Sequence, residues 1–126
     1  MKRALVTGGG GFVGLAIVKA LRSMMGVETS VVGRHTYPQA EEAGARCLPG
    51  DIRNREFLQQ AFQGHDTVFH VAAKAGIWGS HQEYYSINVQ GTENVIDACR
   101  KNGIRTLVYT STPSVVFDGK DLEGQD

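Results

Sequence analysis

The stretch Thr7-Gly8-Gly9-Gly10-Gly11-Phe12-Val13-Gly14 decides the fold of this chain. It follows a short apolar run, Lys2–Thr7, that predicts a buried strand. It also opens a segment, Phe12–Met25, in which apolar residues recur with the 3.6-residue period of a helix. These residues are Val13, Ile17, Leu21 and Met24. In such a strand–glycine–helix unit, one glycine makes the tight turn, another lets a pyrophosphate approach the backbone, and the last lets the helix pack on the strand. The stretch therefore predicts a loop that holds phosphates against the positive end of a helix.

The remaining sequence alternates between strand-like and helix-like patterns. Further strands are predicted at Thr29–Val32, Arg46–Pro49, Thr67–Val71 and Arg105–Thr110. Helices are predicted at Pro38–Ala43, from the capping residue Asn54 to Phe62, and from the capping box Ser80-His81-Gln82-Glu83 to the stop at Asn102-Gly103. Apolar strands that alternate with helices indicate a parallel sheet covered on both faces. Right-handed crossovers then favour one domain over residues 1–126, a doubly wound, Rossmann-like α/β fold with strand order 3-2-1-4-5.

Composition excludes several classes of protein. The 126 residues carry 13 basic and 13 acidic side chains, which argues against nucleic acid as the main partner. No apolar run is long enough for a membrane span, and no signal peptide precedes the first strand, so a cytoplasmic protein is expected. Cys47 and Cys99 are expected to be buried thiols, and the histidines share no metal-ligand spacing. The excess is in glycine, 16 residues, which indicates close approach of backbone to a neighbour.

The spacing Thr-Gly-x-x-Gly-x-x-Gly over Thr7–Gly14 resembles the extended short-chain dehydrogenase/reductase family, also called the epimerase/dehydratase superfamily. Four further segments match the family's motifs in order: Gly50–Arg53, Asp66–Ala73, Tyr85–Thr92 and Arg105–Ser114. The resemblance implies a nicotinamide dinucleotide as cofactor. The residues it implies at the cofactor are Thr7, Gly8, Gly10, Gly11, Phe12, Val13, Gly14, Asp51, Ile52, Ala72, Ala73, Lys74 and Asn88.

Two segments, Lys74–Ser80 and Tyr109–Phe117, resemble the 3β-hydroxysteroid dehydrogenase branch of that family. The branch includes 2-alkyl-3-oxoalkanoate reductases and sterol 4α-carboxylate 3-dehydrogenases. The resemblance therefore implies an NAD(P)-dependent oxidoreductase and a small-molecule substrate, a 3-oxo or 3-hydroxy acid substituted at carbon 2.

The end of the second predicted strand bears on the choice of cofactor. Enzymes that prefer NAD carry an Asp or Glu there for the ribose hydroxyls, but this chain has Gly33-Arg34-His35. Glu28 lies at the opposite end of that strand. A guanidinium binds a 2′-phosphate through paired hydrogen bonds, so Arg34, with His35 beside it, favours NADP(H). NAD stays open if Arg34 is only a solvated loop residue.

The resemblance also implies a catalytic Tyr, a Lys four residues later, and a Ser or Thr hydroxyl that orients the substrate. Thr112 matches the hydroxyl, with Ser111 next to it, and Asn88 resembles an Asn that supports the catalytic hydrogen bonds. No Tyr-x-x-x-Lys pair occurs in the sequence. We therefore expect an N-terminal portion that stops before a sixth strand and the substrate-binding region. By itself it should bind cofactor weakly at best and show no reductase activity.

Several interpretations stay open. The glycine loop and the hydroxyl loop are shared with sugar-nucleotide epimerases and dehydratases, and a non-catalytic NADP(H)-binding sensor would carry the same cofactor loop. Trp78 could line the substrate site or simply pack. His70, on a strand, is interpreted as a packed structural residue, and a homodimer is left open as the assembly.

Overall fold

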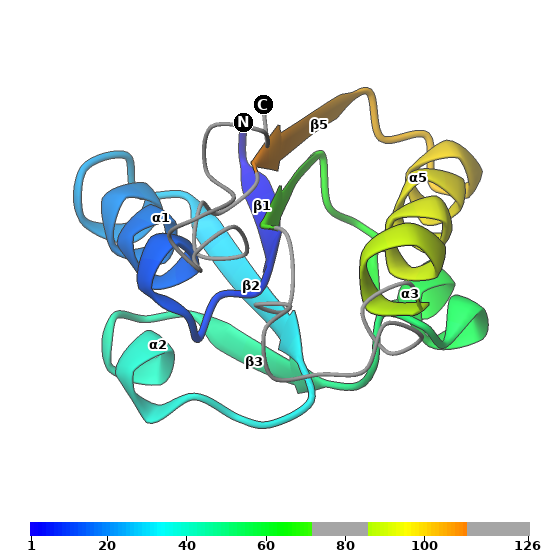
Figure 1. Cartoon of the computed structure of the whole chain (residues 1–126). Helices are drawn as coiled ribbons and strands as arrows, with labels where there is room; N and C mark the ends of the chain where they lie inside the picture. The colour runs from blue at the N-terminus through cyan, green and yellow to red at the C-terminus, as the bar shows by residue number, and fades with distance from the viewer. Residues whose placement is uncertain (72–85, 111–126) are drawn as a thin grey trace, which may run out of the picture.

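The computed structural model describes residues 1–71 and 86–110 and contains a five-stranded parallel sheet of order β3-β2-β1-β4-β5 (Figure 1). The predicted doubly wound topology is confirmed. The strands are β1 (Arg3–Thr7), β2 (Glu28–Gly33), β3 (Arg46–Pro49), β4 (Thr67–Val71) and β5 (Thr106–Thr110). All neighbouring strands pair in parallel, so their carboxyl ends lie along one edge of the sheet.

Helices cover both faces of this sheet. They are α1 (Phe12–Ser23), α2 (Pro38–Glu42), α3 (Arg55–Ala61), the π-helical turn η1 (Ser86–Gln90) and α5 (Gly91–Lys101). Figure 1 shows α1 and α2 on one face, with α3 and α5 on the other. Because η1 runs directly into α5, the residues from 86 to 101 form one continuous helical segment. The predicted start of that helix at Ser80–Glu83 lies outside the described residues.

Two hydrophobic cores lie on the two faces because successive strand residues point in opposite directions. In β1, Ala4 and Val6 face α1 and α2, whereas Leu5 faces α3 and α5. The first core gathers Val18, Leu21 and Val31; the second gathers Leu58, Phe62 and Val95. Near-continuous apolar strands therefore reflect burial on both faces, as the sequence predicts.

The helix boundaries follow local chemistry. The Asn54 side chain accepts a hydrogen bond from the Phe57 N–H at 3.1 Å, which confirms the predicted cap of α3. Gly103 ends α5 with a φ of 68°, a left-handed conformation that suits glycine.

One predicted helix boundary and one predicted burial are wrong. The helix expected over Phe12–Met25 ends at Ser23, and Met24, its C-cap, is 80% exposed. Cys47 is only half-buried because β3 is the outermost strand, with a neighbouring strand on one side only. Cys99 is buried as predicted.

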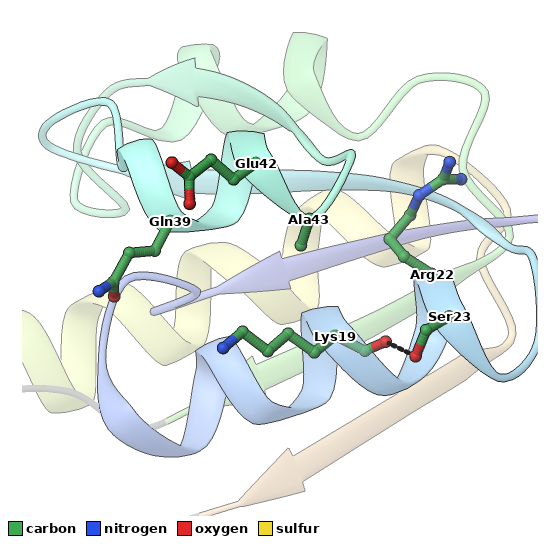
Figure 2. Close-up of a pocket in the computed structure, with 6 residues that line it drawn as sticks. All are labelled: Lys19, Arg22, Ser23, Gln39, Glu42 and Ala43. Atoms are coloured by element: carbon green, nitrogen blue, oxygen red, sulfur yellow. Dashed lines mark hydrogen bonds between the residues drawn. The ribbon is translucent and has the colours of Figure 1, made fainter.

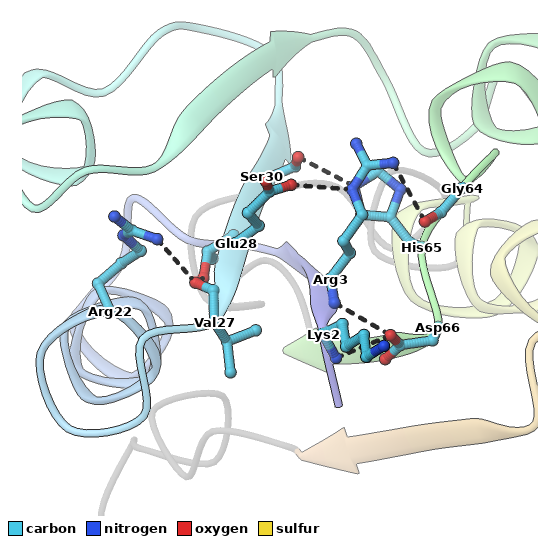
Figure 3. Close-up of polar contacts among 10 residues, drawn as sticks. Lys2, Arg3, Arg22, Val27, Glu28, Ser30, Gly64, His65 and Asp66 are labelled. Carbon is cyan, nitrogen blue, oxygen red and sulfur yellow. Dashed lines mark hydrogen bonds and ion pairs between the residues drawn. The ribbon is translucent and has the colours of Figure 1, made fainter.

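Polar contacts fasten the amino edge of the sheet (Figure 3). The Asp66 carboxylate accepts hydrogen bonds from the backbone N–H groups of Lys2 and Arg3, at 2.8 and 3.0 Å. Arg3 pairs with Glu28 at 3.1 Å, and the buried His65 ring bonds the Ser30 hydroxyl at 2.9 Å. The polar groups named at this edge thus bind one another. The glycine loop lies at the opposite edge of the sheet.

Candidate functional site

The glycine loop connects the end of β1 to the start of α1 at the carboxyl edge of the sheet. Gly8 has a φ of 75°, and a β-carbon on it would come within 3.2 Å of both the side chain and the carbonyl oxygen of Val71. A β-carbon on Gly14 would collide with the Gly8 carbonyl. The first glycine therefore makes the turn and Gly14 lets the helix pack on the loop, which are the roles that the spacing predicts.

The amino end of α1 carries no compensating group of its own. Gly11 is its N-cap, without a side-chain hydrogen bond, and no acidic residue lies in the first turn. In contrast, α3 has the Asn54 cap and Glu56 in its first turn. The first N–H groups of a helix have no partner within it, and they carry a partial positive charge. Gly10 and Gly11 are exposed and the Phe12 side chain is 94% exposed, so this end is open to an anion.

Tyr37 covers part of the loop, which the sequence reasoning missed. A β-carbon on Gly10 would collide with the Tyr37 ring, and one on Gly33 would collide with its hydroxyl end. The Tyr37 N–H contacts the Cys47 sulfur at 3.4 Å and its carbonyl begins α2, so the ring is held at the ends of β1 and β2. Gly10 therefore has a structural reason to be glycine besides any ligand.

Arg34 and His35 lie just beyond the end of β2, and both are exposed. Glu28 begins the same strand, at the far edge of the sheet, where it pairs with Arg3. The cationic side chain of Arg34 therefore lies at the end of β2, and a carboxylate lies in the loop after the next strand, β3.

That carboxylate is Asp51, in the loop after β3. Arg53 holds it with its side chain, at 2.7 Å between Nη2 and Oδ2, and with its backbone N–H at 2.9 Å. The hydrogen bond from the Arg53 side chain lowers the pKa of Asp51, and the charge of Arg34 acts in the same direction. Asp51 is therefore an ionised group already paired with a cation.

Ile52 is anchored to α5. The Asn94 side chain donates to the Ile52 carbonyl at 3.1 Å, and a β-carbon on Gly91 would collide with the Ile52 side chain. The Gly50 N–H donates to the Gly33 carbonyl at 2.7 Å. The loop after β3 is thus fixed between the end of β2 and the start of α5.

Thr7 and His70 meet beneath the glycine loop. The Thr7 hydroxyl lies 2.6 Å from His70 Nδ1, and the Thr92 hydroxyl lies 2.9 Å from His70 Nε2. His70 is 1% exposed, and burial lowers its pKa to about 4. Thr7, a predicted cofactor residue, therefore has its hydroxyl turned into the protein, towards a neutral imidazole.

Several other predicted site residues lie outside the residues that the structure describes. Ala72, Ala73, Lys74, Trp78, Ser111 and Thr112 lie outside the described residues. Asn88 is half-buried in η1, one helical turn before Thr92. Its role, like the roles of Ser111 and Thr112, stays a prediction.

A surface hollow of about 520 Å³ lies elsewhere, between α1 and α2 (Figure 2). None of the predicted site residues lines it. The lining residues are Lys19, Arg22, Ser23, Gln39, Glu42 and Ala43. Within residues 1–71 and 86–110, no group of three or more His, Cys, Asp or Glu could hold a metal ion. No helix in those two ranges is long and apolar enough to cross a membrane.

The sheet order, the glycine turn and the packing of α1 define a Rossmann-like α/β protein with its glycine loop at the carboxyl edge of the sheet. The model of the 3-beta hydroxysteroid dehydrogenase/isomerase family matches residues 5–126. The chain belongs to that family, which confirms the resemblance drawn from its motifs.

Named relatives agree with this assignment. A 2-alkyl-3-oxoalkanoate reductase from Shewanella oneidensis is 47% identical over 124 residues, which are 98% of this chain and 32% of the relative. A 3beta-hydroxysteroid-dehydrogenase/decarboxylase isoform 1 from Arabidopsis thaliana is 46% identical over 93 residues, 73% of this chain and 20% of the relative. The chain spans about a third of the length of the bacterial reductases it matches.

A solved structure supports the fold. The UDP-glucose-4-epimerase from Stenotrophomonas maltophila, with bound NAD and formylated UDP-arabinopyranose, superposes with a TM-score of 0.79 at 25% identity. The match covers 92% of this chain and 38% of the epimerase. The fold is thus that of the short-chain dehydrogenase/reductase proteins.

Proposed function

We propose that this chain is the NADP(H)-binding domain of an oxidoreductase that transfers hydride between NADP(H) and a 3-oxo or 3-hydroxy group. The observation that carries the proposal is the uncapped start of α1 behind a glycine turn, at the carboxyl edge of a parallel sheet. Ligands of open α/β sheets bind at that edge, and phosphates bind at such helix starts.

The residues at that edge fit a dinucleotide. The backbone N–H groups of Gly10 and of the first turn of α1 would bind the pyrophosphate, since no side chain caps this helix. Asp51 and Ile52 would lie against the adenine end, on a loop fixed by Asn94. Bound there, the nicotinamide would supply or accept the hydride. The relative solved as a UDP-glucose-4-epimerase holds NAD, which supports a cofactor of this chemical type.

The preference for NADP(H) rests on Arg34. Its guanidinium is exposed at the end of β2, and the one carboxylate on the neighbouring loop, Asp51, is engaged by Arg53. A 2′-phosphate would therefore meet a cation without a facing free carboxylate, with His35 as a second donor.

Arg34→Ala tests this preference. It should weaken NADP⁺ binding at least tenfold and leave NAD⁺ binding unchanged, because only NADP⁺ carries the 2′-phosphate. Glu42→Ala serves as the control, because Glu42 belongs to α2, on the same face of the sheet as α1, and lies away from the glycine loop. Equal affinity for the two dinucleotides in both the wild type and Arg34→Ala would refute the preference.

The substrate proposal draws on the relatives' names. A 2-alkyl-3-oxoalkanoate reductase and a 3beta-hydroxysteroid-dehydrogenase/decarboxylase both act on a 3-oxygenated compound. We propose a 2-substituted 3-oxo acid or a sterol-like compound as substrate. Thr112, with Ser111 beside it, would orient the substrate oxygen, and Asn88 would support the hydrogen bonds around it.

A second candidate, a sugar-nucleotide epimerase or dehydratase, is favoured by the solved epimerase with the same fold. The two differ in net redox change. A protein of the relatives' full length that carries this chain should consume NADPH in step with reduction of a 2-alkyl-3-oxo acid. Conversion of a sugar nucleotide without consumption of NADPH would instead favour the epimerase.

A further inference from the structure

His70 joins four elements at the edge where the proposed cofactor site lies. It belongs to β4, its Nδ1 meets the Thr7 hydroxyl at the end of β1, and its Nε2 meets the Thr92 hydroxyl on α5. Its ring also lies 5.5 Å from the Tyr109 ring of β5, tilted by 39°. One buried side chain thus contacts the strand before the glycine loop, the helical segment after η1 and a neighbouring strand.

The two threonines occupy informative positions. Thr7 directly precedes Gly8, whose backbone makes the turn of the glycine loop. Thr92 lies four residues after Asn88, so the two residues lie on one side of the same helical segment. The His70 bridge therefore connects the loop proposed to hold the pyrophosphate with the segment that carries a predicted catalytic residue.

We propose that His70, bonded at both ring nitrogens by Thr7 and Thr92, is a positioning residue that sets the glycine loop against the segment carrying Asn88. The inference rests on the proposed function for its effect on a dinucleotide. His70 touches no ligand in this role; it acts through the residues it holds.

The hydrogen-bond chemistry supports a rigid bridge. A neutral imidazole has one N–H donor and one acceptor nitrogen, and each threonine hydroxyl can donate or accept. One hydroxyl therefore donates to His70 and the other accepts from it, which satisfies both ring nitrogens in a buried site. Removal of either hydroxyl leaves a buried ring nitrogen unpaired, so the bridge should loosen as a unit.

Thr92→Val tests the bridge because it removes the hydroxyl and keeps the shape. Thr29→Val is the control: Thr29 is a buried threonine, whereas Thr92 is half-buried, and its hydroxyl donates to the Val27 carbonyl at 2.8 Å near the amino edge of the sheet. Thr92→Ser keeps the hydroxyl and should rescue the wild-type behaviour.

Two readouts are needed. The first is amide hydrogen exchange of Gly8 and Gly11, whose N–H groups bond the Val32 and Gly8 carbonyls at 3.3 and 3.1 Å. The second is the dissociation constant of NADP⁺. We expect Thr92→Val to speed exchange of both amides and to weaken NADP⁺ binding, each by about tenfold. Thr29→Val and Thr92→Ser should match the wild type in both.

The outcomes separate this proposal from the proposed function. Wild-type values for Thr92→Val in both readouts, or equal losses in Thr92→Val and Thr29→Val, would overturn the positioning role while dinucleotide binding stands. If the wild type binds no nicotinamide dinucleotide, the proposed function fails. The amide hydrogen exchange of Gly8 and Gly11, compared between the wild type and Thr92→Val, then decides by itself whether the His70 bridge positions the loop.

Discussion

Mild acid should destabilise this fold through His70. The imidazole is 1% exposed and burial lowers its pKa from 6.5 to about 4, so the folded chain resists a proton that the unfolded chain accepts. Between these two values the unfolded state binds more protons, and the stability therefore falls as the pH falls. Above pH 6.5 both states hold a neutral ring, and the penalty disappears.

The size of the effect follows from the shift. A difference of one pKa unit corresponds to 1.36 kcal/mol, so a drop from 6.5 to about 4 is worth about 3 kcal/mol. A domain of this size has a free energy of unfolding of roughly 5–15 kcal/mol, so this loss is a large fraction of the total.

Urea unfolding of the wild type and of His70→Asn, from pH 7 to pH 4, measures the loss of unfolding free energy that His70 causes. Asn keeps hydrogen-bonding capacity and removes the titration. The wild type should lose about 3 kcal/mol more than His70→Asn over this range. The carboxylates and His65, whose pKa burial also lowers, are common to both proteins and cancel in the difference. His35→Asn controls for loss of an exposed histidine. Parallel pH profiles of the wild type and His70→Asn would show that His70 does not cause the loss of stability in acid.

Three further substitutions probe the loop, a helix start and the amino edge of the sheet. Gly14→Ala should cost about 1–3 kcal/mol of stability and abolish dinucleotide binding, because its β-carbon would collide with the Gly8 carbonyl. Urea unfolding and a binding titration measure the two effects, and wild-type values in both would contradict the close packing at Gly14. Asn54→Ala should lower the free energy of unfolding by about 1 kcal/mol through loss of the cap on Phe57, with no effect on binding; exposed Gln60→Ala is the control, and equal stability of the two variants would count against the cap. Asp66→Ala should lower stability at pH 7 by about 1 kcal/mol, because two backbone N–H groups lose their acceptor. Burial raises the pKa of Asp66, but the hydrogen bonds from Lys2 and Arg3 outweigh it and hold the pKa below its ordinary value of 3.8. The wild type's advantage should therefore begin to fall at about pH 4 and disappear only at the lower pH where the folded carboxylate is protonated; an advantage that does not change with pH would argue against the carboxylate's role.

Much of the fold follows from local sequence signals. The strand order came from the alternation of apolar runs with helices; Asn54 caps the start of α3 and Gly103 follows the end of α5, as their residue types predict. The glycine turn is equally local, since Gly8 and Gly14 are six residues apart and meet in the structure.

The contacts that sequence reasoning missed join residues far apart in the chain. Tyr37 meets Gly10 only because β1 and β2 are neighbours, and no periodic pattern marks an aromatic residue between two strands. His70 was expected to pack, but its bonds to Thr7 and Thr92 span 63 and 22 residues and depend on the register of β1, β4 and α5. The end of α1 was predicted two residues too late, at Met25 instead of Ser23, because a helical pattern does not show where the last turn ends.

In the proposed function, the glycine loop and the start of α1 hold the phosphates of NADP(H). The most direct test is an NMR titration of the chain with NADP⁺, following the amides of Gly8, Gly11 and Gly14. Phosphate binding at the loop should give saturable shifts of these amides, larger at a given concentration for NADP⁺ than for NAD⁺, and Gly14→Ala should abolish the shifts. Unchanged loop amides up to about 10 mM NADP⁺ would contradict it.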